Sequence, residues 1–152
     1  MEFDGVVRIR ASPGRVYEVL ADIQDWAVHP GSPVEAMEKD PPGTTRVGTR
    51  WREVVRIAPL VTLTMWSEAT EVAPDHLLAL RFRGGSMQGR LTYTLVEDGP
   101  DTVLRQQETM HAVGWLKPFD AFLGRSLQGR LGHRLDEIRD MFTAGGPGPE
   151  RR

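Results

Sequence analysis

Two carboxylates lie on strand-like stretches where the alternation of side chains can turn them inward. In residues 48–57, Glu53 shares a face with Trp51 and two aliphatic side chains, while arginines occupy most of the other face. Glu108 belongs to residues 102–112, which carry polar side chains on both faces, so either face brings polar groups inward. An inward carboxylate either has a raised pKa and works as an acid or base, or pairs with an arginine in a structural network.

The neighbouring strands supply groups for either role of these carboxylates. Candidate ion-pair partners are Arg81, Arg83, Arg90 and Arg105. Tyr93 falls on the apolar face of its strand, where its hydroxyl either donates a hydrogen bond to a ligand carbonyl or packs at the rim. If the protein is an enzyme, its candidate catalytic residues are therefore Glu53, Glu108 and Tyr93.

Other kinds of site chemistry find little support in the sequence. No two of its histidines, His29, His76, His111 and His133, stand at metal-ligand spacing. His111 can form an acid/base pair with Glu108 only if the strand bends between them. The chain has no cysteine, which excludes a thiolate nucleophile, and no serine in a G-x-S-x-G motif. We expect neither a metal nor a cofactor.

Alternating apolar and polar residues between Gly- and Pro-rich turns predict seven strands. Their predicted ranges are 3–10, 34–38, 48–57, 61–72, 77–83, 87–96 and 102–112. After the first strand, Ser12 and Pro13 form the start signal of a short helix with one apolar face. Most of the later turns have hairpin length, which implies an antiparallel sheet.

A long amphipathic helix is predicted over residues 115–142. Its apolar side chains recur at steps of three or four: Leu116, Phe119, Leu123, Leu127, Leu131, Leu135, Ile138 and Phe142. Asp120 projects to nearly the middle of this stripe, where it either complements the helix dipole or faces a ligand. The stripe must be buried, and the sheet is its natural partner.

The composition is that of an ordinary globular chain. Its 152 residues are 39% hydrophobic and 26% charged, and the formal net charge of −2 gives no electrostatic case for binding nucleic acid. The length predicts one domain over residues 1–143, and residues 144–152 are predicted to be a disordered tail. No signal-peptide core and no apolar run of about eighteen residues is present, so we expect a cytoplasmic protein without integral membrane association. A monomer and a homodimer both stay open.

Three segments carry a resemblance to a known superfamily: residues 11–26 (ASPGRVYEVLADIQDW), 48–57 (GTRWREVVRI) and 73–85 (APDHLLALRFRGG). With the closing helix, their order resembles the START-like (SRPBCC) superfamily, and most closely its polyketide cyclase/dehydrase and lipid-transport branch. The resemblance implies an α+β helix-grip fold. In that fold a curved seven-stranded antiparallel sheet wraps around a long C-terminal helix, with two short helices after the first strand. Residues 1–143 would then form a single START-like ligand-binding domain.

The resemblance also implies a ligand cavity between sheet and helix, although a filled core is the alternative. The residues predicted to line the cavity are Trp51, Met65, Trp66, Leu91, Tyr93, Gln106, Met110, Asp120, Leu123 and Leu127. The leading expectation is binding of a small hydrophobic or amphipathic ligand, lipid- or polyketide-like. The alternative is an enzyme of the polyketide aromatase, cyclase or dehydratase type that uses the carboxylates and Tyr93. A third reading is a partner-binding module with no ligand.

Overall fold

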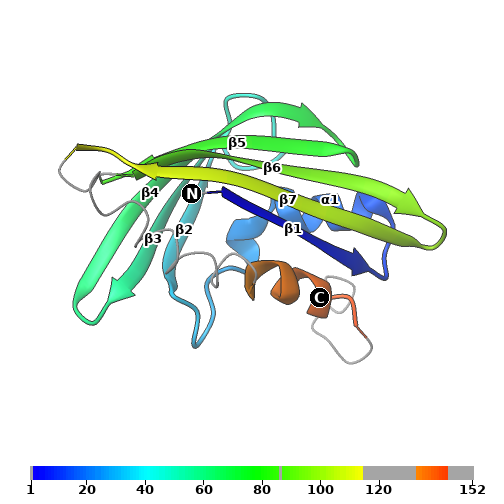
Figure 1. The fold of residues 1–152 in the computed structure, drawn as a ribbon, viewed down its shortest axis with the longest axis horizontal. Coiled ribbons are helices and arrows are strands. Elements are labelled where there is room, and N and C mark those ends of the chain that lie inside the picture. The colour runs from blue at the N-terminus through cyan, green and yellow to red at the C-terminus, as the bar shows by residue number, and fades with distance from the viewer. Residues whose placement is uncertain (1, 86, 115–132, 144–152) are drawn as a thin grey trace.

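A computed structural model describes residues 2–85, 87–114 and 133–143 (Figure 1). The elements are β1 (Glu2–Ile9), α1 (Pro13–Ala21), η1 (Ile23–Asp25), β2 (Val34–Asp40), β3 (Arg50–Ala58), β4 (Val61–Ala73), β5 (Leu77–Gly84), β6 (Met87–Asp98) and β7 (Asp101–Ala112). A further helix covers residues 133–140. The seven predicted strands are confirmed, with ends that differ from the predicted ones by at most two residues. The short predicted helix is confirmed as α1, and the 3-10 turn η1 follows it.

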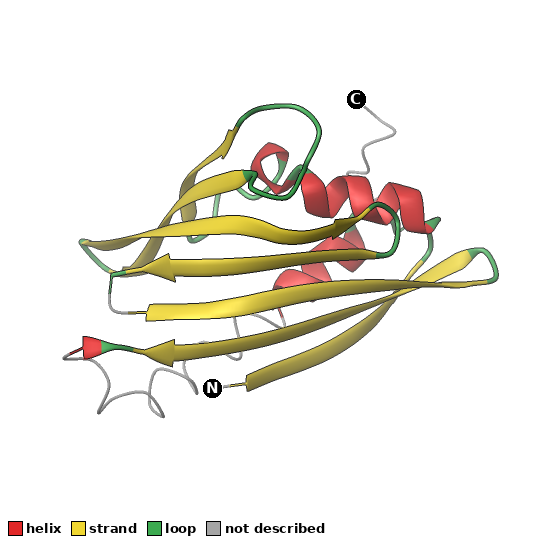
Figure 2. Ribbon diagram, turned by 90° about the horizontal axis from the view of Figure 1, so that it is seen from above, coloured by secondary structure: helices red, strands yellow, loops and turns green. Residues whose placement is uncertain are grey.

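All seven strands form one antiparallel sheet in the order β1-β7-β6-β5-β4-β3-β2. From β2 to β7 each strand pairs with the next in the chain, as hairpin-length turns require. β1 instead joins the far edge beside β7. The chain between β1 and β2 must therefore cross from one edge to the other, and it carries α1 and η1 over one face of the curved sheet (Figure 2).

α1 begins as the sequence predicts. Ser12 is the N-cap residue and Pro13 occupies the first helical position, where its missing N–H removes no hydrogen bond. The helix buries one face, formed by Val16, Tyr17, Val19, Leu20 and Ala21. These side chains join the hydrophobic core together with residues from β3 to β7.

The pleat divides the sheet into an inner face, which packs against α1 and the helix over 133–140, and an outer face. On β7 the inner side chains are Leu104, Gln106, Glu108 and Met110, all at most 7% exposed, while their neighbours Arg105, Gln107, Thr109 and His111 are exposed. The face of this strand that points inward, which the sequence left open, is therefore the one that carries Glu108. His111 lies on the opposite face, so it cannot pair with Glu108 along a regular strand.

Leu135 and Ile138 of the helix over 133–140 are buried in the same core as α1 and the inner face. Gly5 of β1 makes room for this helix, because a Cβ there would lie 2.6 Å from Cδ1 of Leu135. The predicted long helix begins at residue 115, but residues 115–132, with their part of the apolar stripe, lie outside the described residues. The predicted tail 144–152 also lies outside them.

Hydrogen bonds connect the residues that follow α1 to β2 and β3, at the edge of the sheet opposite β1. Nζ of Lys39 donates to Asp22 at 2.9 Å and lies 5.8 Å from the ring centroid of Trp51. Trp51 itself donates from Nε1 to the side-chain oxygen of Gln24, at 3.1 Å. The indole of Trp51 is thus held in place by a structural hydrogen bond, with its apolar ring toward the core.

None of the described helices combines the length and the apolar character that a membrane-spanning helix requires.

Candidate functional site

A small cavity of about 40 Å³ lies on the inner face, where the strands meet α1, η1 and the helix over 133–140. Its described lining residues are Leu20, Ile23, Met37, Trp51, Glu53, Ser67, Leu78, Leu80, Leu91, Tyr93 and Arg134. Most of the wall is apolar, and Glu53, Tyr93 and Arg134 bring polar groups to it. The cavity has about the volume of one water molecule, whereas pockets for drug-sized ligands occupy about 300–1,000 Å³.

Glu53 and Arg134 form an ion pair at this cavity. Nη2 of Arg134 lies 3.1 Å from Oε1 of Glu53, and their side chains are 26% and 12% exposed. Burial lowers the pKa of Arg134, but the charge and hydrogen bond of Glu53 together with the charges of Tyr93 and Glu108 outweigh this effect, and the pKa is raised overall. Arg134 therefore stays charged and holds Glu53 as its counter-ion. The arginines predicted as partners, Arg81, Arg83, Arg90 and Arg105, are instead exposed on the outer face.

Glu108 is buried without a cationic partner among the described residues. Its Oε2 accepts a hydrogen bond from Nε2 of Gln106 at 3.2 Å. Burial raises the pKa of Glu108 to about 7, although the Gln106 bond and the charge of Arg134 act in the opposite direction. Glu108 of β7 is the register partner of Leu91 in β6, which lines the cavity, and of Phe3 in β1. Its carboxyl group thus carries a proton for part of the time near neutral pH.

Tyr93 and Gln106 are cross-strand partners, and each has one buried polar atom that lacks a hydrogen bond. The hydroxyl of Tyr93 and Oε1 of Gln106 are buried and have no partner within the described part of the chain. Burial also raises the pKa of Tyr93, so its hydroxyl stays protonated and is a donor. Buried polar atoms in folded proteins are nearly always paired, so two such atoms on paired residues of neighbouring strands indicate a place where another polar group binds.

The inner face and the helix over 133–140 therefore hold four polar functions, from β3, β6, β7 and that helix. It offers a hydroxyl donor, an amide acceptor, a carboxyl group that exchanges a proton near pH 7, and a fixed ion pair. This set can hold one polar group of a mostly apolar ligand, and it can donate or accept a proton next to that group. Among the described residues, no cluster of histidines and carboxylates suits a metal ion.

The sequence matches the family described as polyketide cyclase/dehydrase and lipid transport over residues 1–142. The chain belongs to this family. The resemblance to the START-like (SRPBCC) superfamily that the sequence suggested is thereby confirmed, and so is the curved seven-stranded antiparallel sheet. No protein of curated function matches the sequence.

Several solved structures share the fold of this chain. The Zhui aromatase/cyclase from Streptomyces sp. R1128 is 21% identical, with a TM-score of 0.68 over 96% of this chain and 98% of that one. Ara h 8.0201 is 10% identical, with a TM-score of 0.72 over 91% of this chain and 95% of that one. The protein TTHA0849 from Thermus thermophilus is 20% identical, with a TM-score of 0.65 over 91% of both chains. At these identities the likeness shows the fold alone.

The structure brings several of the predicted site residues of this family member together. Trp51, Glu53, Leu91 and Tyr93 line the inner cavity, whereas Gln106, Glu108 and Met110 lie on the same face beside it. Met65 is also on this face, directly opposite Glu53. The predicted residues Asp120, Leu123 and Leu127 lie outside the described residues.

Trp66 does not line the inner cavity, contrary to the prediction. It follows Met65 in β4, and successive side chains of a strand point to opposite faces, so both cannot face inward. Trp66 is 48% exposed and lies on the outer face.

The residue of the candidate site that the sequence analysis missed is Arg134. It stands four residues before Ile138, so the two lie on the same side of a helix. An arginine beside an apolar stripe could have suggested a buried ion pair, but the sequence does not say which carboxylate it meets.

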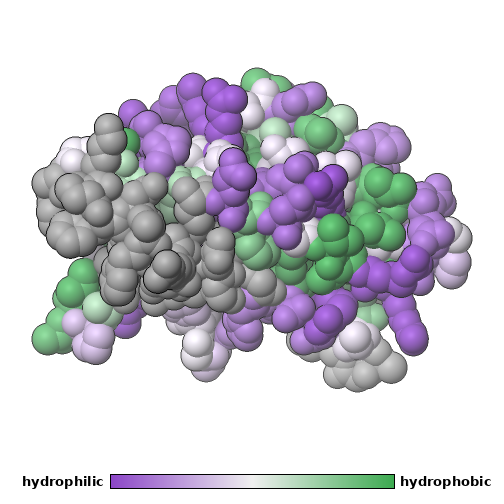
Figure 3. Space-filling model, in the orientation of Figure 1, coloured by the Kyte–Doolittle hydropathy of each residue, from purple (hydrophilic) through white to green (hydrophobic). Residues whose placement is uncertain are grey.

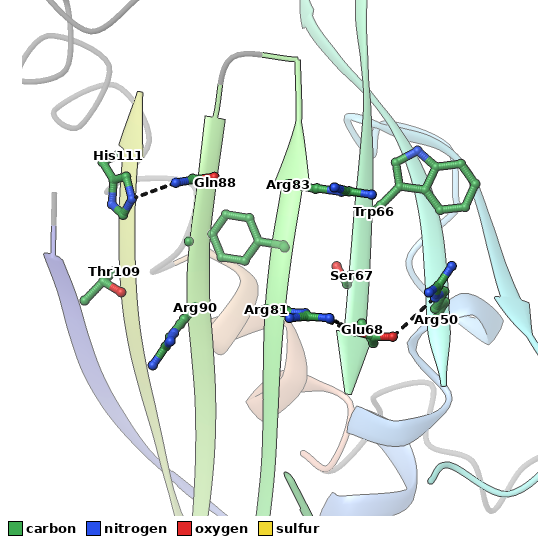
Figure 4. Close-up of a pocket in the computed structure, with 12 residues that line it drawn as sticks. Arg50, Trp66, Ser67, Glu68, Arg81, Arg83, Gln88, Arg90, Thr109 and His111 are labelled. Atoms are coloured by element: carbon green, nitrogen blue, oxygen red, sulfur yellow. Dashed lines mark hydrogen bonds and ion pairs between the residues drawn. The ribbon is translucent and has the colours of Figure 1, made fainter. Parts of the chain in front are cut away.

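A second, larger groove of about 700 Å³ lies over the outer face of β3 to β7 (Figure 4). Its lining is rich in arginine, in contrast to the apolar wall of the inner cavity. Hydrophilic side chains also gather along the rim of the molecule over β5 (Figure 3).

Proposed function

We propose that the protein binds a small hydrophobic or amphipathic ligand, lipid- or polyketide-like, on the inner face of its sheet. The observation that carries the proposal is the pair of unpartnered buried atoms, the hydroxyl of Tyr93 and Oε1 of Gln106, beside an apolar cavity wall. Membership of the polyketide cyclase/dehydrase and lipid transport family supports the same class of ligand.

The polar end of such a ligand would meet complementary groups. The phenolic hydroxyl of Tyr93 donates to a ligand oxygen, and Oε1 of Gln106 accepts from a ligand hydroxyl. A phenol or enol group satisfies both at once, because one oxygen accepts and donates. A ligand of the same shape without that oxygen would leave both atoms unpaired, so the pair favours hydroxylated ligands.

The ligand's apolar part needs more room than about 40 Å³. We propose that residues 115–142 form one long helix whose Asp120, Leu123 and Leu127 contribute the rest of the wall. In this proposal residues 1–143 act as one cytoplasmic domain, as a monomer or homodimer.

The test uses a matched pair of probes, 2-naphthol and 2-methylnaphthalene, which have nearly the same shape and differ in one hydroxyl group. Wild-type protein should bind 2-naphthol about tenfold more tightly by calorimetry, and Tyr93→Phe should abolish this preference while it leaves 2-methylnaphthalene unaffected. Mass spectrometry of extracts from the purified protein should also find a retained amphipathic compound. Failure of both probes to bind at millimolar concentration, with no retained compound, would refute the proposal.

A second candidate function is acid/base catalysis on a carbonyl compound, as in an aromatase, cyclase or dehydratase. One specific observation favours it: Glu108 is buried, has no ion-pair partner among the described residues, and has a pKa of about 7. A carboxyl group with this pKa can remove a proton next to a carbonyl and return it at the neighbouring oxygen. The hydroxyl of Tyr93, one strand away, can stabilise the enolate oxygen that forms. Glu53 is the weaker candidate because its side chain is already engaged in the ion pair with Arg134.

Hydrogen–deuterium exchange at the α-carbon of a cyclic ketone tests this candidate by NMR. Wild-type protein should accelerate the exchange, and Glu108→Gln should remove most of the acceleration, while Glu53→Gln retains it. Equal rates with wild-type protein and Glu108→Gln would show that Glu108 transfers no proton, and the protein would then be a binding protein only.

A further inference from the structure

The two edges of the sheet differ in how well they are protected against pairing with another strand. β2, at one edge, has a bulge between Val34 and Ala36 and a charged run at residues 38–40, and both features hinder the docking of a further strand. β1, at the other edge, keeps one register with β7 over all 8 of its residues. Within the described part of the chain, its second edge has no strand partner (Figure 2). β1 is therefore the edge to which a strand can be added.

The exposed side chains of β1 and of the residue that follows it are arranged in an order that can complement itself. Alternate residues of this stretch are exposed, namely Glu2, Asp4, Val6, Arg8 and Arg10. Two acids come first, a valine stands in the middle, and two arginines come last. A second copy that runs antiparallel has the reverse order. The acids of one copy then face the arginines of the other.

Opposite charges select one register for such a pair of strands. With Val6 of both copies at the two-fold axis, Asp4 of one copy stands opposite Arg8 of the other, and Glu2 stands opposite Arg10. A shift by two residues keeps the exposed side chains on one face, but it places Val6 opposite Asp4 or Arg8. The register centred on Val6 thus gives both acids an arginine as cross-strand partner.

Asp4 and Arg8 already have partners within the chain, but both keep capacity for a second one. Arg105 donates to both carboxylate oxygens of Asp4, at 2.9 and 2.6 Å, while Arg8 donates to Asp98 and Asp101. The side chains of Asp4 and Arg8 remain 50% and 55% exposed. A carboxylate has about four acceptor sites and a guanidinium group about five donors. A row of alternating charges can therefore continue from one copy into the other.

We infer that β1 is a self-association surface, through which two copies of this chain pair antiparallel about Val6 and join their sheets. The backbone of an edge strand offers unpaired N–H and C=O groups to such a partner. The contact at the axis would be apolar, because Val6 is 58% exposed in the single chain and would stand directly opposite its counterpart. The inner faces of both copies would lie on the same side of the joined sheet. This inference does not depend on the function proposed for the inner face.

Sedimentation velocity over a series of protein concentrations tests the inference. One pair of strands is a small interface, so wild-type protein should be monomeric when dilute and dimeric at about 1 mM. Val6→Lys places two like charges at the axis and should raise the dissociation constant of the dimer about tenfold.

Val96→Lys is the matched control. Val96 is also an exposed valine, at 56%, but it lies in β6, which β7 separates from β1. This variant adds the same charge and should leave the dissociation constant unchanged. Wild-type protein that stays monomeric at every concentration would overturn the inference. Equal weakening of the dimer by Val6→Lys and Val96→Lys would also overturn it.

Charge reversal tests the register of the two strands. Asp4→Lys and Arg8→Glu each place like charges opposite one another in a dimer of identical copies, so each variant alone should dimerise about tenfold more weakly than wild-type protein. In an equimolar mixture the two reversals compensate each other at both ion pairs, and a mixed dimer should form at the wild-type concentration. A mixture that associates no better than either variant alone would contradict the pairing of Asp4 with Arg8 and overturn the inference.

Discussion

Glu108 on the inner face and Glu68 on the outer face are carboxylates of the same sheet with opposite behaviour. Burial raises the pKa of Glu108, whereas hydrogen bonds from Arg81 and Arg50 lower the pKa of Glu68. The outer face gathers four arginines around its carboxylate, while the inner face leaves Glu108 with an amide as its hydrogen-bond donor. The comparison shows that alternation along a strand decides more than which side chains are buried. It also decides which groups can exchange protons and which can hold anions.

The largest difference between the two faces should appear in stability. Leu104 is completely buried on the inner face of β7, so Leu104→Ala should lower the free energy of unfolding by about 2–5 kcal/mol. Gln107, three residues further on, points outward and is exposed, and Gln107→Ala should change it by less than about 0.5 kcal/mol. Urea denaturation of both variants measures the difference. Similar losses in the two variants would show that the faces are not divided as described.

The pH dependence of stability sharpens the comparison at Glu108. An unfolded glutamate has its ordinary pKa of 4.5, and the folded group has a pKa of about 7. Between these values the folded state binds the extra proton, so stability falls as pH rises from about 4.5 to 7 and stays lower above that. The loss amounts to roughly 3 kcal/mol for a shift of this size.

Glu108→Gln should remove this dependence, because the amide does not titrate. Denaturation curves at several pH values between the two pKa values should converge for the variant and spread for the wild-type protein. If both proteins lose stability equally over this range, another group is responsible.

Loss of the inner ion pair should have a smaller effect. Arg134→Met leaves the partly buried carboxylate of Glu53 without its partner, which should destabilise the fold by about 1–3 kcal/mol. The double variant Glu53→Gln/Arg134→Met removes both charges and should recover part of this loss. A double variant less stable than Arg134→Met alone would show that Arg134 acts mainly through packing rather than through Glu53.

The smallest effect is expected on the outer face, and it should have the opposite sign. Arg90 stands directly across from Arg81, so Arg90→Gln relieves a repulsion and should raise the melting temperature by about 1 °C at low salt. The gain should vanish at high salt, where exposed charges are screened. A fall in the melting temperature would mean that Arg90 already has a stabilising partner. That result would break the contrast between a face built for stability and a face that carries unpaired exposed charge.

Most of the sheet could be predicted because its signals are local. Alternation and Gly- or Pro-rich turns locate the strands, and the Ser12-Pro13 pair starts α1. The inward face of β7 could not be predicted, since both faces carry polar groups. Its orientation follows from pairing with β1 and β6 and from packing against distant helices, which no local pattern records.

The sequence could predict which carboxylates belong to the candidate site, but it could not predict which residues they pair with. Glu53 was placed inward by its neighbours in β3, yet its arginine comes from a position 81 residues away. Trp66 was assigned to the cavity because it is large and apolar, a criterion that ignores its position in the pleat beside Met65. The outer groove escaped notice because an arginine face is usually a solvated one. That Arg83 and Arg90 are diagonal neighbours depends on the register of the β5–β6 hairpin.

The place of β1 at the edge beside β7 has a consequence for the order of assembly. Strands β2 to β7 pair with sequence neighbours, whereas β1 must wait for a partner about a hundred residues later, so its docking closes the longest loop in the sheet. Phe3 of β1 lies across from Glu108. The burial that raises the pKa of Glu108 is therefore complete only in the closed sheet, so protonation of this carboxyl group and closure of the sheet favour each other near neutral pH.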